Sequence, residues 1–104
     1  IEPEMAFADL NDNMDNVEAY LKYVVSYVLE NCHEDMLFFN KYISEGLIER
    51  LSQLVDTNFE RASYTYAVRI LEKSGRAFQY PIKWGMDLQT EHERYLAEEF
   101  FSKP

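Results

Sequence analysis

Residues 1–8 have the sequence IEPEMAFA, in which larger apolar side chains alternate with carboxylates and small side chains. One side of the alternation holds Ile1, Pro3, Met5 and Phe7, and the other holds Glu2, Glu4, Ala6 and Ala8. Side chains alternate across a β-strand, so this pattern predicts a short strand over residues 1–8. Pro3 cannot donate a ladder hydrogen bond, which argues mildly against a central strand, but the alternation is cleaner than any helical spacing here.

The rest of the chain predicts helices. Apolar residues recur at spacings of three and four between residues 15 and 31, and Asp15 with Glu18 has the spacing of a capping box. The other predicted elements are helices over 34–43, 45–55, 65–73 and 90–101, a brief extended piece at 59–62 and an irregular connection over 78–88. Thr65 and the Thr90–Glu93 pair are the expected caps, and Gly75 stands where a helix-ending glycine is expected.

A single strand among several helices predicts a mostly helical α+β chain. The strand has no partner in this sequence, so its hydrogen bonds must go to a sheet elsewhere. The 104 residues suffice for one domain or part of one, begin with Ile1 and end on Pro104 with no stop signal. We therefore expect residues 1–104 to be an internal piece of one larger domain.

The charge balance is acidic, with 19 acidic against 10 basic residues and a net charge of −9. Nucleic acids are held largely by Lys and Arg on phosphates, so this chain is on average a poor candidate for the part that holds RNA. Lys73, Arg76 and Lys83 are scattered in the sequence and form no basic run.

Several classes of protein are disfavoured by simple absences in the sequence. Cys32 is the single cysteine, so no internal disulfide can form, and nothing indicates secretion. No apolar stretch approaches the roughly 18 residues of a membrane span, and no signal-peptide pattern is visible. A cytoplasmic location is the resulting expectation.

Glu2 and Glu4 are the first candidate binding residues. On a strand, a spacing of two puts both carboxylates on one face, about 7 Å apart. Ala6 and Ala8 on that face are small and leave room for a ligand, such as an ammonium group or a metal. The alternative is a solvated strand face with two ordinary acids, and the pattern alone favours that alternative.

A second candidate lies in residues 84–96, WGMDLQTEHERYL, where a glycine and a polar turn precede a capped helix. Glu91, Glu93 and Arg94 on the first turns of that helix could be aimed at a site, although acids in a first helical turn also simply suit the helix dipole. His33 and His92 lack the partners of a zinc site, so no metal site is predicted. Cys32 next to His33 is not a nucleophile–base pair, and the isolated glycines form no phosphate-binding loop.

Five segments of the sequence then point to a family. Residues 2–10 (EPEMAFADL) and 84–96 resemble asparaginyl-tRNA synthetases, and so, in the same order, do the segments at 19–24, 35–39 and 64–72. The resemblance covers essentially the whole chain. It implies a class II catalytic domain, an antiparallel sheet flanked by helices. Residues 1–8 would be the end of the second motif 2 strand, and the rest of the chain would be the helical stretch between signature motifs 2 and 3. Motif 1, motif 3 and the anticodon-binding domain would lie outside.

The resemblance also implies an activity: asparagine and ATP, with Mg²⁺, give asparaginyl-adenylate, and the asparaginyl group passes to tRNA(Asn). Glu2 would contact the bound amino acid, with Glu4 beside it, while most of the ATP and Mg²⁺ site and the homodimer interface would lie outside these residues. Asp87, Glu91 and Arg94 would orient pocket elements or hold the helix to the sheet. A chain of this kind would be inactive alone. The alternatives are an aspartyl-type synthetase, a synthetase-derived asparagine synthetase, or a non-enzymatic acidic helical module that binds a protein partner.

Overall fold

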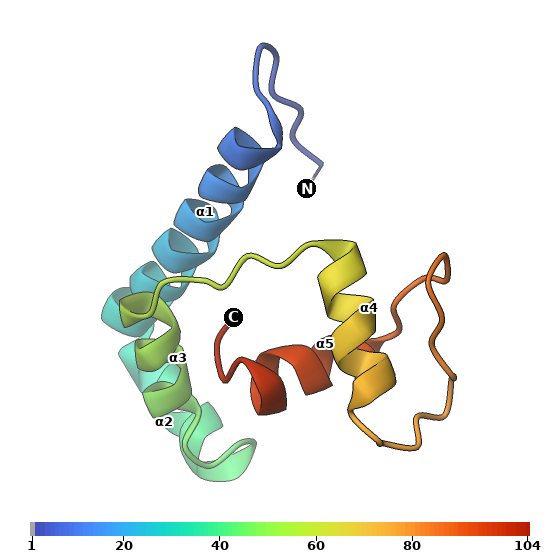
Figure 1. Ribbon diagram of the computed structural model, residues 1–104. Helices are drawn as coiled ribbons and strands as arrows, with labels where there is room; N and C mark the ends of the chain where they lie inside the picture. Colours follow the sequence, from blue (N-terminus) through green and yellow to red (C-terminus); the bar gives the residue numbers. More distant parts are fainter. Residues whose placement is uncertain (1) are drawn as a thin grey trace. The chain divides into compact units, whose positions relative to one another are not determined.

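The computed structural model describes residues 2–104, and all regular secondary structure within that range is helical (Figure 1). The chain divides into two units between Thr57 and Asn58. The helices of the first unit are α1 (Leu10–Asn31), α2 (His33–Tyr42) and α3 (Leu47–Asp56). Those of the second unit are α4 (Tyr64–Lys73), α5 (Thr90–Arg94) and the π-helical segment η1 (Tyr95–Phe100). The mostly helical character predicted from the sequence is confirmed.

The strand predicted over residues 1–8 is wrong at Ala6 and Phe7, whereas over residues 2–5 it stays a prediction, because its partner strand is expected outside this chain. Residues 2–5 have no regular secondary structure, and Ala6 and Phe7 form a turn in which Phe7 has a φ of 57°. A strand is held by ladder hydrogen bonds, and residues 2–104 contain no second strand to provide them. Ile1, the first residue of the predicted strand, lies outside the described residues.

Helix α1 begins at Leu10 because Asp9 caps it. The Asp9 carboxylate accepts hydrogen bonds from the backbone N–H groups of Asn11 at 2.8 Å and Asp12 at 3.0 Å. The Asp12 carboxylate in turn accepts the Asp9 N–H at 2.9 Å, which completes a capping box. The capping box predicted at Asp15 and Glu18 is therefore wrong, since these residues lie inside the helix.

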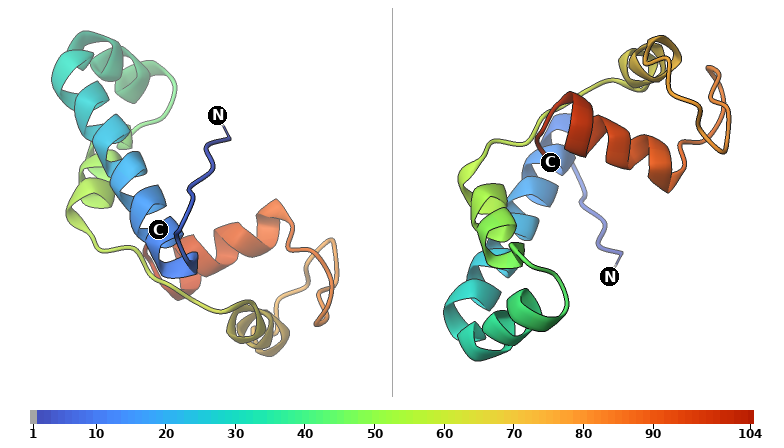
Figure 2. Two further views of the ribbon diagram at one scale, coloured as in Figure 1. Left: turned by 90° about the horizontal axis from the view of Figure 1, so that it is seen from above. Right: turned by 90° about the horizontal axis from the view of Figure 1, so that it is seen from below.

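Helices α2 and α3 fold back beside α1, and Figure 2 shows α3 running alongside it. Gly46 begins α3 with a φ of 75°, a left-handed conformation that suits glycine. The preceding turn is fixed by Arg50, whose guanidinium donates to the backbone carbonyl of Glu45 at 2.8 Å and to the hydroxyl of Ser44 at 2.6 Å. The Asn40 side chain also accepts the N–H of Ile48 at 3.1 Å, which ties α2 to the start of α3.

Much of the apolar surface of the first unit remains exposed. Met36 is the one large apolar side chain that is buried among residues 2–57. On α1 the exposed apolar side chains are Leu10, Val17, Tyr20, Leu21, Tyr23, Val24 and Tyr27, and on α2 they are Leu37, Phe38, Phe39 and Tyr42. Contiguous exposed apolar surface of this kind marks interaction sites in stable proteins.

The second unit has a small apolar core. The buried side chains are Ala67, Val68, Ile70 and Leu71 from α4, Ile82 from the connection and Leu96 from η1. Helix α4 begins one residue before the predicted Thr65, because the Ser63 hydroxyl caps it by accepting the N–H of Tyr66 at 3.2 Å. Gly75 follows the helix with a φ of 67°, as predicted, and the connection over 78–88 is irregular, as predicted.

The last helix begins at Thr90, as predicted, but changes character at Tyr95. From there to Phe100 the backbone is π-helical, and the N–H of Phe101 bonds the carbonyl of Leu96, five residues back, at 2.9 Å. The cap predicted from Thr90 and Glu93 is wrong, because the start of α5 is capped by Gln89 and His92.

Candidate functional site

The segment before α1 holds the first pair of predicted site residues. A hollow of about 530 Å³ beside this segment is lined by Pro3 and Met5 together with residues of α1. Glu2 and Glu4 are exposed and are not part of that lining. The carboxylates thus alternate with the apolar side chains that face α1, even though the backbone forms no strand.

The two carboxylates have the properties of acids available to a ligand. No ion pair or hydrogen bond joins either of them to another group within residues 2–104. Such carboxylates can accept charge-assisted hydrogen bonds from an ammonium or amide group of a ligand. The roles predicted for Glu2 and Glu4 remain predictions.

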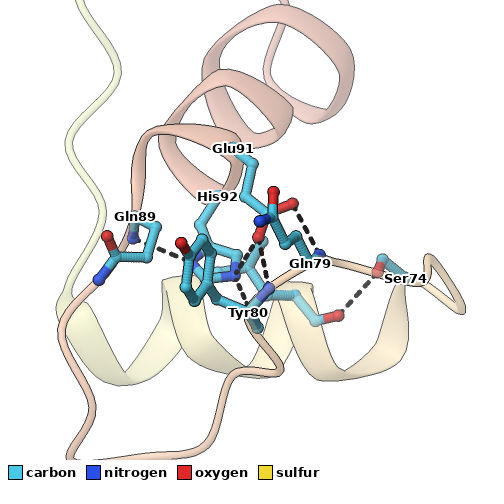
Figure 3. A network of polar contacts seen from close by, with 7 residues as sticks. Ser74, Gln79, Tyr80, Gln89, Glu91 and His92 are labelled. Carbon is cyan, nitrogen blue, oxygen red and sulfur yellow. Dashed lines mark hydrogen bonds and ion pairs between the residues drawn. The ribbon is translucent and has the colours of Figure 1, made fainter.

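The second group of predicted residues lies in the other unit, around the start of α5. Glu91 accepts two backbone hydrogen bonds, from Gln79 at 3.0 Å and from Tyr80 at 2.8 Å (Figure 3). These N–H groups, that of Tyr80 first, hold the pKa of the Glu91 carboxyl below its ordinary value. The carboxylate therefore fastens the connection at residues 79–80 to α5.

His92, next to Glu91, is buried with 1% of its surface exposed. Its Nδ1 accepts the N–H of Gln89 at 2.9 Å, and its Nε2 lies 2.8 Å from the carbonyl oxygen of Tyr80 (Figure 3). These two partners assign the neutral tautomer that carries its hydrogen on Nε2, so that the ring donates to Tyr80. The edge of the Phe78 ring system packs against it at a centroid distance of 4.9 Å.

A further set of contacts holds the turn at residues 84–86 to the start of α4. The Tyr64 hydroxyl donates to the carbonyl of Met86 at 2.7 Å and accepts the N–H of Gly85 at 2.8 Å. The Trp84 indole N–H donates to the Thr65 hydroxyl at 3.0 Å, and the Trp84 and Tyr64 rings meet edge to face at 5.9 Å. The connection is thus fastened at both of its ends.

Asp87 and Arg94 are exposed and lie outside these two sets of contacts. Arg94 forms an ion pair with Glu98 one turn later, at 3.2 Å, of the exposed kind that contributes little to stability. Glu91 is therefore the one member of this predicted group with a defined task in the fold, and the supporting role predicted for Asp87 and Arg94 remains a prediction.

Metal ligands are not gathered in the described part of the chain. No three side chains of His, Cys, Asp or Glu among residues 2–104 lie close enough together to hold an ion. No helix among them is long and apolar enough to cross a membrane.

Sequence reasoning missed the roles of His92, Tyr64 and Trp84. His92 was considered only as a metal ligand, whereas the structure makes it the centre of a buried polar network. The available signal was its position three residues after Gln89, the spacing of a cap and its N3 partner. Tyr64 and Trp84 carry no comparable signal, because they meet across about 20 residues of chain.

Comparison with known proteins identifies the family. The family described as "tRNA synthetases class II (D, K and N)" matches residues 1–103. Proteins named "Asparagine--tRNA ligase" align with the entire chain at 70% identity in Protochlamydia amoebophila, 60% in Clostridium novyi and 58% in Clostridium tetani. The chain spans 22% of the length of each of these relatives. On this evidence, the chain belongs to the class II tRNA synthetases of the D, K and N group.

Proposed function

We propose that the intact protein is an asparagine–tRNA ligase, which activates asparagine with ATP to asparaginyl-adenylate and transfers the asparaginyl group to tRNA(Asn). The main support is the 70% identity, over all 104 residues, to a protein named Asparagine--tRNA ligase. Relatives of the same name at 60% and 58% identity add to it. Because the chain spans 22% of their length, the activity is assigned to the intact protein and not to these residues alone.

We further infer that residues 1–104 are an internal part of a single catalytic domain, between signature motifs 2 and 3. The antiparallel sheet of that domain would then be formed by residues outside this range. The exposed apolar side chains of α1 and α2 support the inference, because a stable domain covers surface of this kind. We also predict that the intact protein forms a homodimer through motif 1 and that it is located in the cytoplasm.

Within this chain, Glu2 and Glu4 are the proposed contacts to the amino acid. Their support is the exposure of both carboxylates away from the apolar hollow against α1. A charge-assisted hydrogen bond to the substrate contributes about 1.5–3 kcal/mol. ATP and Mg²⁺ would be held mainly by residues outside 1–104, where they supply the activated phosphate and neutralise its charge.

The alternative functions differ in measurable ways. An aspartyl-type synthetase or a synthetase-derived asparagine synthetase would accept aspartate, because these enzymes share an adenylation site and differ in the amino acid. A non-enzymatic helical module would instead be a self-contained fold, so the 104-residue chain alone would melt cooperatively and bind little of a hydrophobic dye. Our proposal predicts poor cooperativity and strong dye binding for the chain alone.

The proposal is tested by charging assays on the intact protein with tRNA(Asn) and with tRNA(Asp). We expect ATP-dependent formation of asparaginyl-tRNA(Asn) and no stable charging with aspartate. Charging of either tRNA with aspartate in preference to asparagine would establish the aspartyl-type alternative. If the intact protein neither charges a tRNA nor forms an adenylate, the remaining alternative is the non-enzymatic module that binds a protein partner.

A further inference from the structure

A second hollow, of about 540 Å³, opens between α4 and η1 in the second unit. It is lined by Tyr66, Arg69, Ile70 and Lys73 of α4, by Ser74 just after α4, and by Tyr95 and Phe100 of η1. The lining therefore contains two cationic side chains and three aromatic rings but no carboxylate. None of these residues was singled out as a candidate site residue from the sequence.

The two cations are available to a ligand. Arg69 and Lys73 lie one turn apart on α4 and are both exposed. Neither side chain has an ion pair or hydrogen bond within the described part of the chain. Glu72, beside Lys73 on the same helix, is not part of the lining.

The neighbouring charge on η1 is already neutralised. Glu99 forms an ion pair with Arg76, and the Arg76 guanidinium lies over the ring of Tyr95, 5.6 Å from its centroid. Arg76 thus neutralises Glu99 beside the ring of Tyr95, which lines the hollow. The local field favours an anion.

The net charge of the chain does not show that the positive side chains around the hollow lie together, because the two units differ in charge. Residues 1–57 hold 12 acidic and 3 basic side chains, which account for the whole net charge of −9, whereas residues 58–104 hold 7 of each. The expectation that this chain repels RNA therefore applies to the first unit. It does not apply to the face of the second unit that carries Arg69 and Lys73.

We propose that this hollow contacts a single-stranded part of the tRNA, with Arg69 and Lys73 on phosphates and an exposed ring stacked on a base. The inference rests on the proposed function, which provides the RNA. Within the described part of the chain, Tyr66 and Phe100 expose 50% and 47% of their surface, which leaves room for a base beside their rings. Single strands are held in this way, by cations along the backbone and aromatic rings under the bases. Free nucleotides, in contrast, are mostly enclosed by their sites, and this hollow is open.

The test measures tRNA binding by the intact protein over a range of salt concentrations. The double variant Arg69→Gln/Lys73→Gln removes the two charges but keeps good helix formers on α4. The matched control, Lys41→Gln/Lys83→Gln, removes two exposed charges elsewhere. For the hollow variant we expect a tRNA Kd roughly tenfold higher at low salt, and a slope of log K against log salt that is less steep by about 1.4–1.8. For the control, the slope of log K against log salt should differ from that of the parental protein by less than about half of the change expected for one charge.

A second variant, Tyr66→Leu, separates stacking from charge. We expect its tRNA Kd to rise about fivefold with the salt slope unchanged, because base stacking does not release counterions. Unchanged tRNA binding in the charge variant, or equal losses in the charge variant and its control, would overturn the assignment of this hollow to tRNA.

Asparagine-dependent pyrophosphate exchange, which needs no tRNA, distinguishes the failure of this inference from the failure of the proposed function. If the parental protein exchanges pyrophosphate and the hollow variant binds tRNA normally, only the hollow assignment fails. If the parental protein neither exchanges pyrophosphate nor binds tRNA, both proposals fail. A raised KM for ATP in exchange with unchanged tRNA binding would make the hollow a nucleotide site and would also contradict the inference.

Discussion

The imidazole Nε2 of His92 lies 2.8 Å from the carbonyl oxygen of Tyr80 and thereby joins α5 to a connection 12 residues earlier in the chain. The other ring nitrogen takes the N–H of Gln89, so both polar atoms of a 1%-exposed side chain are used. Buried polar groups that are fully paired hold one arrangement, and they are costly to leave half-paired.

His92→Ala in the intact protein should therefore be destabilising. It leaves the Tyr80 carbonyl and the Gln89 N–H without their partner and opens a space beside Phe78. We expect a loss of about 2–4 kcal/mol in the free energy of unfolding of the domain, measured by chemical denaturation. The matched control is His33→Ala, which removes an exposed histidine and should stay within about 0.5 kcal/mol of the parental protein. Equal effects of the two substitutions would contradict the role of His92.

The contact of Glu91 with the connection at residues 79–80 should make the stability of the fold depend on pH. Its folded-state pKa lies below the ordinary value of 4.5 because the carboxylate accepts the N–H groups of Tyr80 and Gln79. The stabilisation is thus fully present above about pH 4.5 and is lost as the pH falls through the folded-state pKa. Glu91→Gln should be less stable than the parental protein at pH 7, and the difference should shrink on acidification.

Denaturation curves of the parental protein and of Glu91→Gln between pH 3 and pH 7 test this expectation. Glu93→Gln serves as the control, because Glu93 is an exposed acid of the same helix without backbone contacts to the connection. A pH-independent difference between Glu91→Gln and the parental protein would show that the charge of Glu91 does not stabilise the fold.

Gly85 tests the docking of the turn at residues 84–86. Its φ is 95°, and an added Cβ would meet nothing within 4 Å, so the cost of a side chain there comes from the backbone alone. We expect Gly85→Ala to destabilise the domain by about 1–2 kcal/mol in thermal or chemical unfolding. Gly85→Asn should cost less, because asparagine tolerates positive φ better than alanine. The reverse order of the two would point to a steric cause.

The helices were largely predictable from the sequence, because the spacing of apolar residues is a local property. The start of α1 was not, because Asp9–Asp12 and Asp15–Glu18 have the same capping spacing and only the folded chain uses the first pair. The strand predicted over residues 1–8 is interrupted by a turn at Ala6 and Phe7, which the alternating pattern does not indicate. The change to π-helix at Tyr95 has no sequence pattern of its own.

The candidate site was predictable only in part. Glu91 was named, but its partners are backbone N–H groups of Gln79 and Tyr80, which no sequence pattern identifies. Arg69 and Lys73 were not identified as site residues, because their neighbours in the hollow come from η1, more than 20 residues away. Contacts between distant segments depend on tertiary structure. The net charge of the chain does not show which charged side chains lie together on one face.

Glu2 provides the test of the substrate contact. Glu2→Ala in the intact protein should lower kcat/KM for asparagine in pyrophosphate exchange by tenfold or more, the loss of roughly one charged hydrogen bond. Glu45→Ala, which removes an exposed acid elsewhere in the same unit, should leave exchange unchanged. Kinetics of Glu2→Ala equal to those of the parental protein would remove Glu2 from the site.

The most direct measurement of the central claim compares asparagine with aspartate in ATP–pyrophosphate exchange catalysed by the intact parental protein. If the protein is an asparagine–tRNA ligase, asparagine should support exchange with a kcat/KM at least about a hundredfold above that for aspartate, a difference of about 2.7 kcal/mol in transition-state binding. Exchange supported equally well by aspartate, or by neither amino acid, would contradict it.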